Sequence, residues 1–279
     1  MPWASIAKVT VGIAVVVILI LGLLWLGQRA LIYHPDSSSP TAPSGVEEVS
    51  FRTDDDIELA AWRFDPDESV DRGAAVLIAP GNAGNRSVRA PLADDLVADG
   101  FTVVTMDYRG YGGNDGSPTE EGLYSDVRAA WDYLSEDFAS EEIILFGESL
   151  GVGVVTGLAT DVDPAGLILR SPFTSLADVG QATFRILPVK LLIRDRYPVV
   201  EHLQDNSAPV VVIFSDDDEI IPSEQSREVT QAARDSGVDV TEVEVQQARH
   251  NDLDLAAGAD VIESVSSLAD SLGMTHTQQ

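Results

Sequence analysis

A serine flanked by glycines is the first feature of this chain that could do chemistry. Ser149 lies at the centre of GESLG, residues 147–151, which fits the pattern G-x-S-x-G. The apolar run IILF precedes it and the small-residue stretch LGVGVVTGLAT follows, which predicts a sharp turn between a buried strand and a helix. Such a turn holds the serine hydroxyl clear of the backbone. We therefore predict that Ser149 is a nucleophile; the alternative is a glycine-rich turn with a passive serine.

A serine hydroxyl needs a general base near neutral pH, and the usual base is a histidine held by a carboxylate. The chain has four histidines. His34 follows the apolar N-terminal segment, His202 precedes a predicted strand, and His276 lies in a polar tail. His250, in QQARHNDLD, falls between the last predicted strand and the last predicted helix, at the sheet edge where Ser149 also lies. His250 is therefore the predicted base.

The carboxylate of such a triad is expected in IFSDDDEIIP, which follows the seventh predicted strand. The order serine, acid, histidine along the chain is one that serine hydrolases use. A run of acids is usually a solvated loop, and residue type alone does not say which side chain faces inward. The candidates from this run are Asp216, Asp217, Asp218 and Glu219.

A glycine- and asparagine-rich turn, IAPGNAG at residues 78–84, follows the third predicted strand. Acyl transfer needs backbone N–H groups that stabilise an oxyanion, one from the loop after this strand and one from the residue after the nucleophile. These positions are Asn82 and Leu150. A phosphate-binding turn is the alternative, but Gly81 and Gly84 do not make G-x-G-x-x-G, and no Gly-Lys-Ser/Thr follows.

Alternating strand-like and helical segments must position these residues. Apolar runs bounded by helix-like stretches predict an α/β fold with a mostly parallel sheet covered on both faces. The predicted helices cover about residues 86–98, 119–136, 150–160, 222–236 and 253–272. The predicted strands are VEEVSFRT and IELAAWRF as an opening hairpin, then AAVLIA, TVVTMDY, IILFG, GLILRS, PVVVIFS and DVTEVEV.

The segments outside this alternation have characters of their own. Residues 173–208 are too long for a simple crossover and predict a short helical cap insertion in a domain spanning 46–272. Residues 9–27 carry no charge and are long enough to cross a bilayer, which predicts a transmembrane helix after a tail at 1–8. A long signal sequence is the alternative, but LLWLGQRAL offers only a poor cleavage site. Residues 28–45, rich in Ser and Pro, read as a linker, and 273–279 as a polar tail.

The charge balance is strongly acidic, with 46 Asp and Glu against 17 Lys and Arg and a formal net charge of −29. Such a surface repels nucleic acid. The carboxylates are scattered among periodic apolar segments, which indicates a folded acidic surface. We interpret it as adaptation to high salt, where cations screen self-repulsion. An ordinary acidic protein with a cationic partner is the alternative. The chain contains no cysteine, so disulfides are excluded.

Together these motifs resemble the α/β-hydrolase superfamily, in particular its membrane-anchored members and serine aminopeptidase-like relatives. The resemblance covers about residues 46–272 and implies the α/β-hydrolase fold with an eight-stranded sheet. The family pattern G-x-x-D-x-x-V/I-P, aligned on Pro222, implies that Asp218 is the triad acid. The chain departs from the family at Pro80, where histidine is usual before Gly81, and at Arg170, where an acidic residue is common.

We therefore expect a membrane-tethered serine hydrolase that cleaves an ester or thioester of a small-molecule, lipid or acylated substrate through Ser149, Asp218 and His250. No metal or organic cofactor is required by this chemistry. The alternatives are a peptidase or aminopeptidase of the same fold, and a non-catalytic binding module at the membrane. The single N-terminal anchor is expected to leave the domain on the extracytoplasmic side; Lys8 before the span and Arg29 after it nearly balance.

Overall fold

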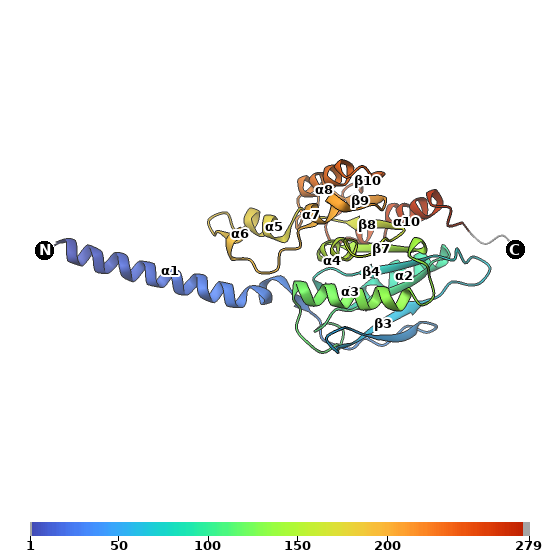
Figure 1. Cartoon of the computed structure of the whole chain (residues 1–279), viewed down its shortest axis with the longest axis horizontal. Coiled ribbons are helices and arrows are strands. Elements are labelled where there is room, and N and C mark those ends of the chain that lie inside the picture. The colour runs from blue at the N-terminus through green and yellow to red at the C-terminus, as the bar shows by residue number, and fades with distance from the viewer. Residues whose placement is uncertain (1, 276–279) are drawn as a thin grey trace.

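An α/β domain with a long N-terminal helix makes up the structure, a computed structural model that describes residues 2–275 (Figure 1). Helix α1 (Pro2–Ile32) projects from the domain as a rod, and α10 (Ala259–Ser271) lies at the domain's opposite end. The part of the expected polar tail from His276 onward lies outside the described residues.

A twisted eight-stranded sheet forms the centre of the domain, in the order β10-β9-β8-β7-β4-β6-β3-β2. Strand β3 pairs antiparallel with both of its neighbours, and every other pairing in this sheet is parallel. The strands match the predicted ones: β2 (Glu47–Arg52), β3 (Glu58–Phe64), β4 (Ala75–Ala79), β6 (Thr102–Met106), β7 (Ile143–Glu148), β8 (Gly166–Arg170), β9 (Val210–Phe214) and β10 (Val240–Glu244). The predicted fold class is confirmed.

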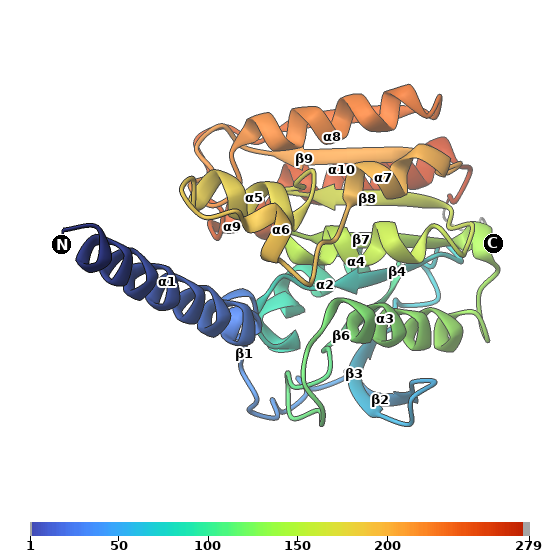
Figure 2. The same ribbon diagram turned by 60° about the vertical axis from the view of Figure 1, so that its left-hand side comes forward.

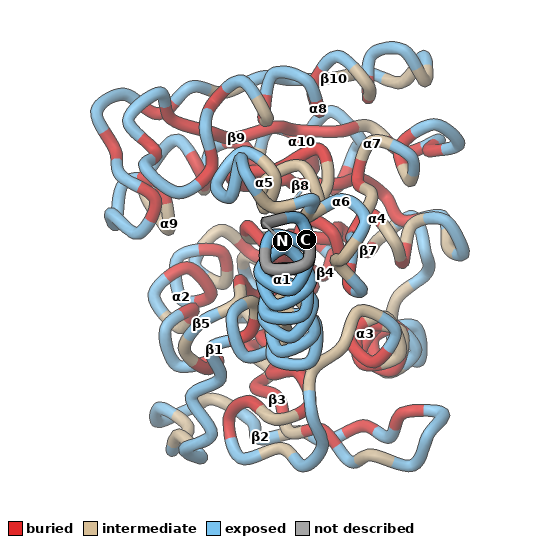
Figure 3. Tube along the Cα trace, turned by 90° about the vertical axis from the view of Figure 1, so that its left-hand side faces the viewer, coloured by how far each residue is buried: buried red, intermediate tan, exposed pale blue. Residues whose placement is uncertain are grey.

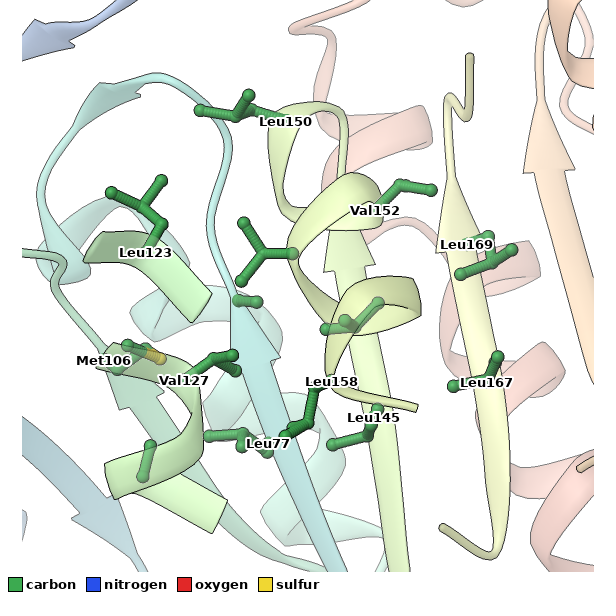
Figure 4. Packing of buried hydrophobic residues seen from close by; sticks show 14 of the residues in the cluster. Leu77, Met106, Leu123, Val127, Leu145, Leu150, Val152, Leu158, Leu167 and Leu169 are labelled. Carbon is green, nitrogen blue, oxygen red and sulfur yellow. The ribbon is translucent and has the colours of Figure 1, made fainter. Parts of the chain in front are cut away.

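Helices cover both faces of the sheet because the central strands are apolar on both sides. Leu77 of β4 belongs to one core cluster and Ile78 to the other, as strand alternation requires. Figure 4 shows Leu77 and Leu145 meeting Val127 of α3 and Leu158 of α4 in the first cluster. Helices α3 (Glu120–Leu134), α4 (Leu150–Leu158) and α8 (Ser223–Asp235) pack in the first cluster. Helices α2 (Ala90–Ala98), α9 (Leu253–Ala257) and α10 (Ala259–Ser271) pack in the second.

The last predicted helix is divided in the structure. Gly258 separates α9 from α10 with an extended backbone, φ −75° and ψ 173°. A Cβ at this position would lie 2.3 Å from the carbonyl oxygen of Asp254, so only glycine fits the bend. The apolar periodicity continues across the break, which is why the sequence predicts one helix.

The insertion between β8 and β9 contains short helices and lies on the side from which α1 projects (Figure 2). Its elements are α5 (Leu176–Thr183), α6 (Val189–Leu192), α7 (Val199–His202) and the 3-10 helix η3 (Leu203–Asp205). Two further 3-10 helices, η1 (Arg86–Arg89) and η2 (Ser140–Glu142), precede α2 and β7. From Ile6 to Ile32, α1 is apolar enough to cross a membrane, with a mean hydropathy of 2.9, and its most apolar stretch is not buried.

Candidate active site

Ser149 occupies the sharp turn between β7 and α4. Its backbone has φ 51° and ψ −112°, a left-handed conformation that is costly for a residue with a side chain. Its N–H donates to the carbonyl of Arg170, 2.9 Å away. Gly151 lets the helix approach β4, since a Cβ there would lie 2.1 Å from the Ala79 oxygen. The surrounding fold therefore holds Ser149 in a strained turn at the carboxyl end of β7.

His250 and Asp218 form a buried pair. The imidazole Nδ1 lies 2.7 Å from Oδ2 of Asp218. The Ser171 hydroxyl donates to the same carboxylate oxygen at 2.9 Å, and the N–H groups of Ile220 and Ile221 donate to the other oxygen. Burial would raise the pKa of Asp218, but the imidazole and these donors hold it below its ordinary value. The carboxylate is thus charged and aimed at His250.

The structure distinguishes the four acids that residue type left open. Asp218 alone among them is buried. Asp216 pairs with Arg227, and Asp217 is exposed. Glu219 accepts from Arg249 and from the backbone N–H of His250. Only Asp218 therefore faces the imidazole.

Ser149 and His250 line one pocket of about 730 Å³ at the carboxyl edge of the sheet. Asn82 and Leu150 line it as well. Within residues 2–275, the serine hydroxyl makes no hydrogen bond to the imidazole; such contacts are often long without substrate. The pocket thus brings together the residues that the sequence predicts for one site.

The turn after β4 presents the backbone of Asn82 to this pocket. The Asn82 carbonyl accepts hydrogen bonds from the N–H of His34 and the hydroxyl of Tyr111, and its side chain donates to the carbonyl of Ile32 at 2.7 Å. In the described part of the chain, the N–H groups of Asn82 and Leu150 donate to no acceptor. Both donors are therefore free for an oxyanion.

The sequence does not predict a buried ionic cluster in the wall of the pocket. Glu148, directly before the nucleophile, accepts two hydrogen bonds from Arg89, at 3.0 and 2.7 Å, and pairs with Arg170 at 2.8 Å. Burial would raise the pKa of Glu148, but the two guanidinium groups outweigh it and lower the pKa to about 2. Arg170 also donates to the backbone carbonyl of His250 at 2.9 Å. Arg170, which stands where an acidic residue is common in the family, thus connects the turn of Ser149 to the loop of His250.

The segment expected as a linker lies against the domain at its N-terminal end. Residues 28–32 continue α1, and Tyr33 is only 4% exposed. Next, β1 (His34–Pro35) pairs in parallel with β5 (Ala83–Gly84), beside the Asn82 turn. Leu31, Ile32 and His34 line the pocket. The Ser- and Pro-rich composition reads as flexible, but these long-range contacts hold residues 28–36 in place.

Of the other two histidines that the structure describes, His202 does not line the pocket of Ser149, whereas His34 does. His202 in α7 is partly buried beside Thr156, 3.2 Å away, and burial lowers its pKa to about 4. His34 lines the pocket, and its backbone N–H donates to the carbonyl of Asn82. Among residues 2–275, no group of three or more His, Cys, Asp or Glu side chains is arranged to hold a metal ion.

The strand order, the turn at Ser149 and the pocket at the sheet edge define an α/β hydrolase. The chain belongs to this superfamily, and its residues 71–194 match the family model described as "Serine aminopeptidase, S33". An uncharacterized protein of Mycobacterium tuberculosis is 43% identical over 249 residues, with 87% of each chain covered. Protein bem46 of Schizosaccharomyces pombe is 31% identical over 75% of this chain and 76% of its own.

Two further comparisons concern proteins with named activities. Lysophosphatidylserine lipase ABHD12 of Danio rerio is 30% identical over 58% of this chain and 47% of its own. The structure of an esterase from Pyrococcus furiosus superposes with a TM-score of 0.69 over 87% of this chain and 98% of the esterase, at 18% identity. The latter shows the fold.

Proposed function

We propose that the protein is a membrane-tethered serine hydrolase that cleaves esters or thioesters through an acyl-enzyme. One observation carries the proposal: a buried Asp218–His250 pair, 2.7 Å apart, shares a pocket with a serine held in a strained strand-to-helix turn. A hydrogen-bonded carboxylate and imidazole beside a presented hydroxyl are the parts that nucleophilic catalysis by serine needs.

The proposed reaction begins when the Ser149 Oγ attacks the substrate carbonyl while His250 Nε2 takes its proton. Asp218 holds Nδ1–H and stabilises the imidazolium. The N–H groups of Asn82 and Leu150 bind the oxyanion. The intermediate collapses as His250 protonates the leaving alcohol or thiol. A water molecule, deprotonated by His250, then attacks the acyl-enzyme and releases the acid and Ser149.

The pocket lining favours an acyl group over a peptide with a free amine. Apolar side chains from α1, α2, the cap and α9 form much of its wall, among them Leu92, Phe173, Leu176, Val179 and Leu253. Recognition of an ammonium group needs an available carboxylate. Glu148 is the one carboxylate among the lining residues, and two arginines neutralise it. The lipase and esterase names among the similar proteins agree with this preference.

The tether in this proposal is α1, whose apolar stretch is long enough to span a bilayer and is uncovered. We propose that the domain lies on the extracytoplasmic side of the membrane. The test is covalent labelling of the full-length chain in detergent by a fluorophosphonate probe, at low and at molar salt. Labelling is expected for the parent and not for Ser149→Ala. If the folded parent is not labelled at either salt, the hydrolase proposal fails and a non-catalytic binding module becomes the better description.

A further inference from the structure

One stretch of the cap is more apolar than most of the domain's surface. Residues 184–196, which we name the cap tip, expose Phe184, Ile186 and Leu191, which are 53%, 98% and 84% accessible. Elsewhere in residues 33–275, the exposed large apolar side chains are Val88, Ile220, Leu253 and Leu272. All of these except Leu272 line the pocket. Exposed apolar surface is therefore gathered on the cap tip and around the pocket mouth.

The charge of the cap tip is also unlike that of the surrounding protein. It carries Arg185, Lys190, Arg194 and Arg196 in a chain with 46 acidic residues and 17 basic ones. Within residues 2–275, the lysines and arginines that form no ion pair with a carboxylate are Lys8 and three from the cap tip, Arg185, Arg194 and Arg196. Uncompensated positive charge is therefore concentrated here.

Several contacts hold the cap tip against the end of α1. The Gln28 side chain donates to the carbonyl of Leu192 and accepts from the N–H of Arg194, at 3.2 and 2.7 Å. Arg29 forms two hydrogen bonds to Asp195, at 2.9 and 3.0 Å. The guanidinium of Arg194 lies 5.0 Å from the centre of the Trp25 ring. Figure 3, viewed along α1, shows α5 and α6 beside the helix.

These contacts fix the height of the cap tip relative to a bilayer. Residues 9–27 of α1 are uncharged and span about 28 Å, close to the thickness of the hydrocarbon core. The core therefore ends near Trp25 and Gln28, and tryptophan favours that boundary. Because Trp25 and Gln28 contact the cap tip, its basic groups lie at the level of the lipid headgroups and its apolar side chains can reach the first acyl carbons.

We propose that the cap tip docks on the anionic lipid surface of the membrane that α1 spans, and that the pocket receives its substrate from that surface. The inference rests on the membrane anchor of the proposed function and extends it to the substrate class, a membrane amphiphile with an acyl ester. The basic groups of the cap tip are complementary to anionic headgroups. The rest of the chain, whose net charge makes the total −29, is repelled by such headgroups, so the cap tip is the face that would contact them. Leu31 and Ile32 of α1 line the pocket, so its mouth opens beside the docked face.

The docking test uses the full-length chain in vesicles and measures depth, without any need for catalysis. The chain has no cysteine, so Ile186→Cys gives a single site for an environment-sensitive fluorophore. In phosphatidylcholine vesicles containing phosphatidylglycerol, spin-labelled lipid is expected to quench this probe. Leu272→Cys, directly after α10, is the matched exposed control and is expected to remain unquenched. Equal quenching at both sites, or none at residue 186, would overturn the inference.

The charge component has its own variants. Arg185→Gln and Arg196→Gln are each expected to lower the ratio of docked to undocked protein about fivefold in the anionic vesicles, and less at molar salt. Arg52→Gln on β2, an exposed arginine with only 3.7 Å ion pairs, is the control and should leave the ratio unchanged. A blue-shifted probe that lipid does not quench would indicate that a second copy of the chain covers the cap tip, contrary to the inference.

Substrate access is tested with the triple variant Phe184→Ser, Ile186→Ser, Leu191→Ser. Its hydrolysis of an ester embedded in vesicles is expected to fall at least ~10-fold, with hydrolysis of p-nitrophenyl acetate unchanged. Equal loss on both substrates would contradict delivery from the membrane. Fluorophosphonate labelling separates the two proposals: a parent that is labelled but does not dock refutes only the inference, whereas one that docks without labelling refutes only the hydrolase.

Discussion

The guanidinium of Arg170 donates a hydrogen bond of 2.9 Å to the backbone carbonyl of His250, 80 residues away in the sequence. The same side chain pairs with Glu148, the residue before Ser149, at 2.8 Å. One buried arginine therefore joins the loop that carries the proposed base to the turn that carries the proposed nucleophile. This is a positioning role, because the Arg170 guanidinium acts through the His250 backbone and the Glu148 carboxylate.

Replacement of Arg170 by Met is expected to misplace His250 and to reduce kcat for p-nitrophenyl acetate about 10- to 100-fold, with a smaller change in KM. Arg170→Lys should restore part of the rate, since it retains one donor and the charge. The measurement is kcat and KM with the pH–rate profile. A variant that is less stable but has unchanged kcat per folded molecule would show that Arg170 is only structural.

Asp218→Asn is expected to lower kcat about 10⁴-fold, because the amide cannot stabilise the imidazolium. Asp217→Asn is the matched control: Asp217 is an adjacent acid whose side chain is exposed, and its replacement should leave kcat within about twofold. Steady-state kinetics of both purified variants decide the matter. A comparable loss in the two would mean that the assignment from the buried contact is wrong.

Glu148 should contribute to stability in a pH-dependent way. Its pKa is about 2 in the folded protein against an ordinary value of 4.5, so its contribution is complete above about pH 4.5 and is lost as pH falls through 2. Glu148→Gln removes the charge and is expected to lower the free energy of unfolding by on the order of 3 kcal/mol. The free energies of unfolding of parent and variant, measured in urea, should differ most near pH 7 and less near pH 3. A constant difference would show that the ion pairs contribute little.

Salt should stabilise the fold if the acidic surface reflects adaptation to a saline environment. Screening of a net charge of −29 reduces self-repulsion, whereas it weakens the exposed ion pairs by a smaller amount. We expect Tm to rise by at least ~2 °C between about 0.1 M and molar KCl, equivalent to about 1 kcal/mol for a domain of this size. A falling Tm would favour the alternative of an acidic protein with a cationic partner.

The features that the sequence predicts correctly are local ones. Each strand of the large sheet is an apolar run bounded by turn residues, and the glycines around Ser149 specify a tight turn by their small size. The position of His250 follows from its place after the last strand, because the carboxyl ends of parallel strands meet at one edge. Residue type and order were therefore enough to bring Ser149, His250, Asn82 and Leu150 to one pocket.

The features that residue type alone left open depend on contacts between distant segments. Asp216, Asp217 and Asp218 are chemically identical, and only the tertiary fold turns one of them towards His250. Glu148 reads as an unremarkable residue of the nucleophile turn until Arg89 and Arg170 are seen around it. Composition also does not reveal that the segment after α1 is held in place. The Tyr33 hydroxyl bonds to Asp195 and Tyr197, more than 150 positions away.

The contacts between residues 32–35 and the Asn82 turn join α1 to the pocket without a flexible connection. The carbonyl of Ile32 and the N–H of His34 both bond to Asn82, whose own N–H is the proposed oxyanion donor. An enzyme on a flexible stalk can sample a range of distances from its membrane, whereas the tethered enzyme that we propose would hold its pocket at one fixed distance. Distance from the bilayer would then act as a filter on its substrates, independent of how well a molecule fits the pocket.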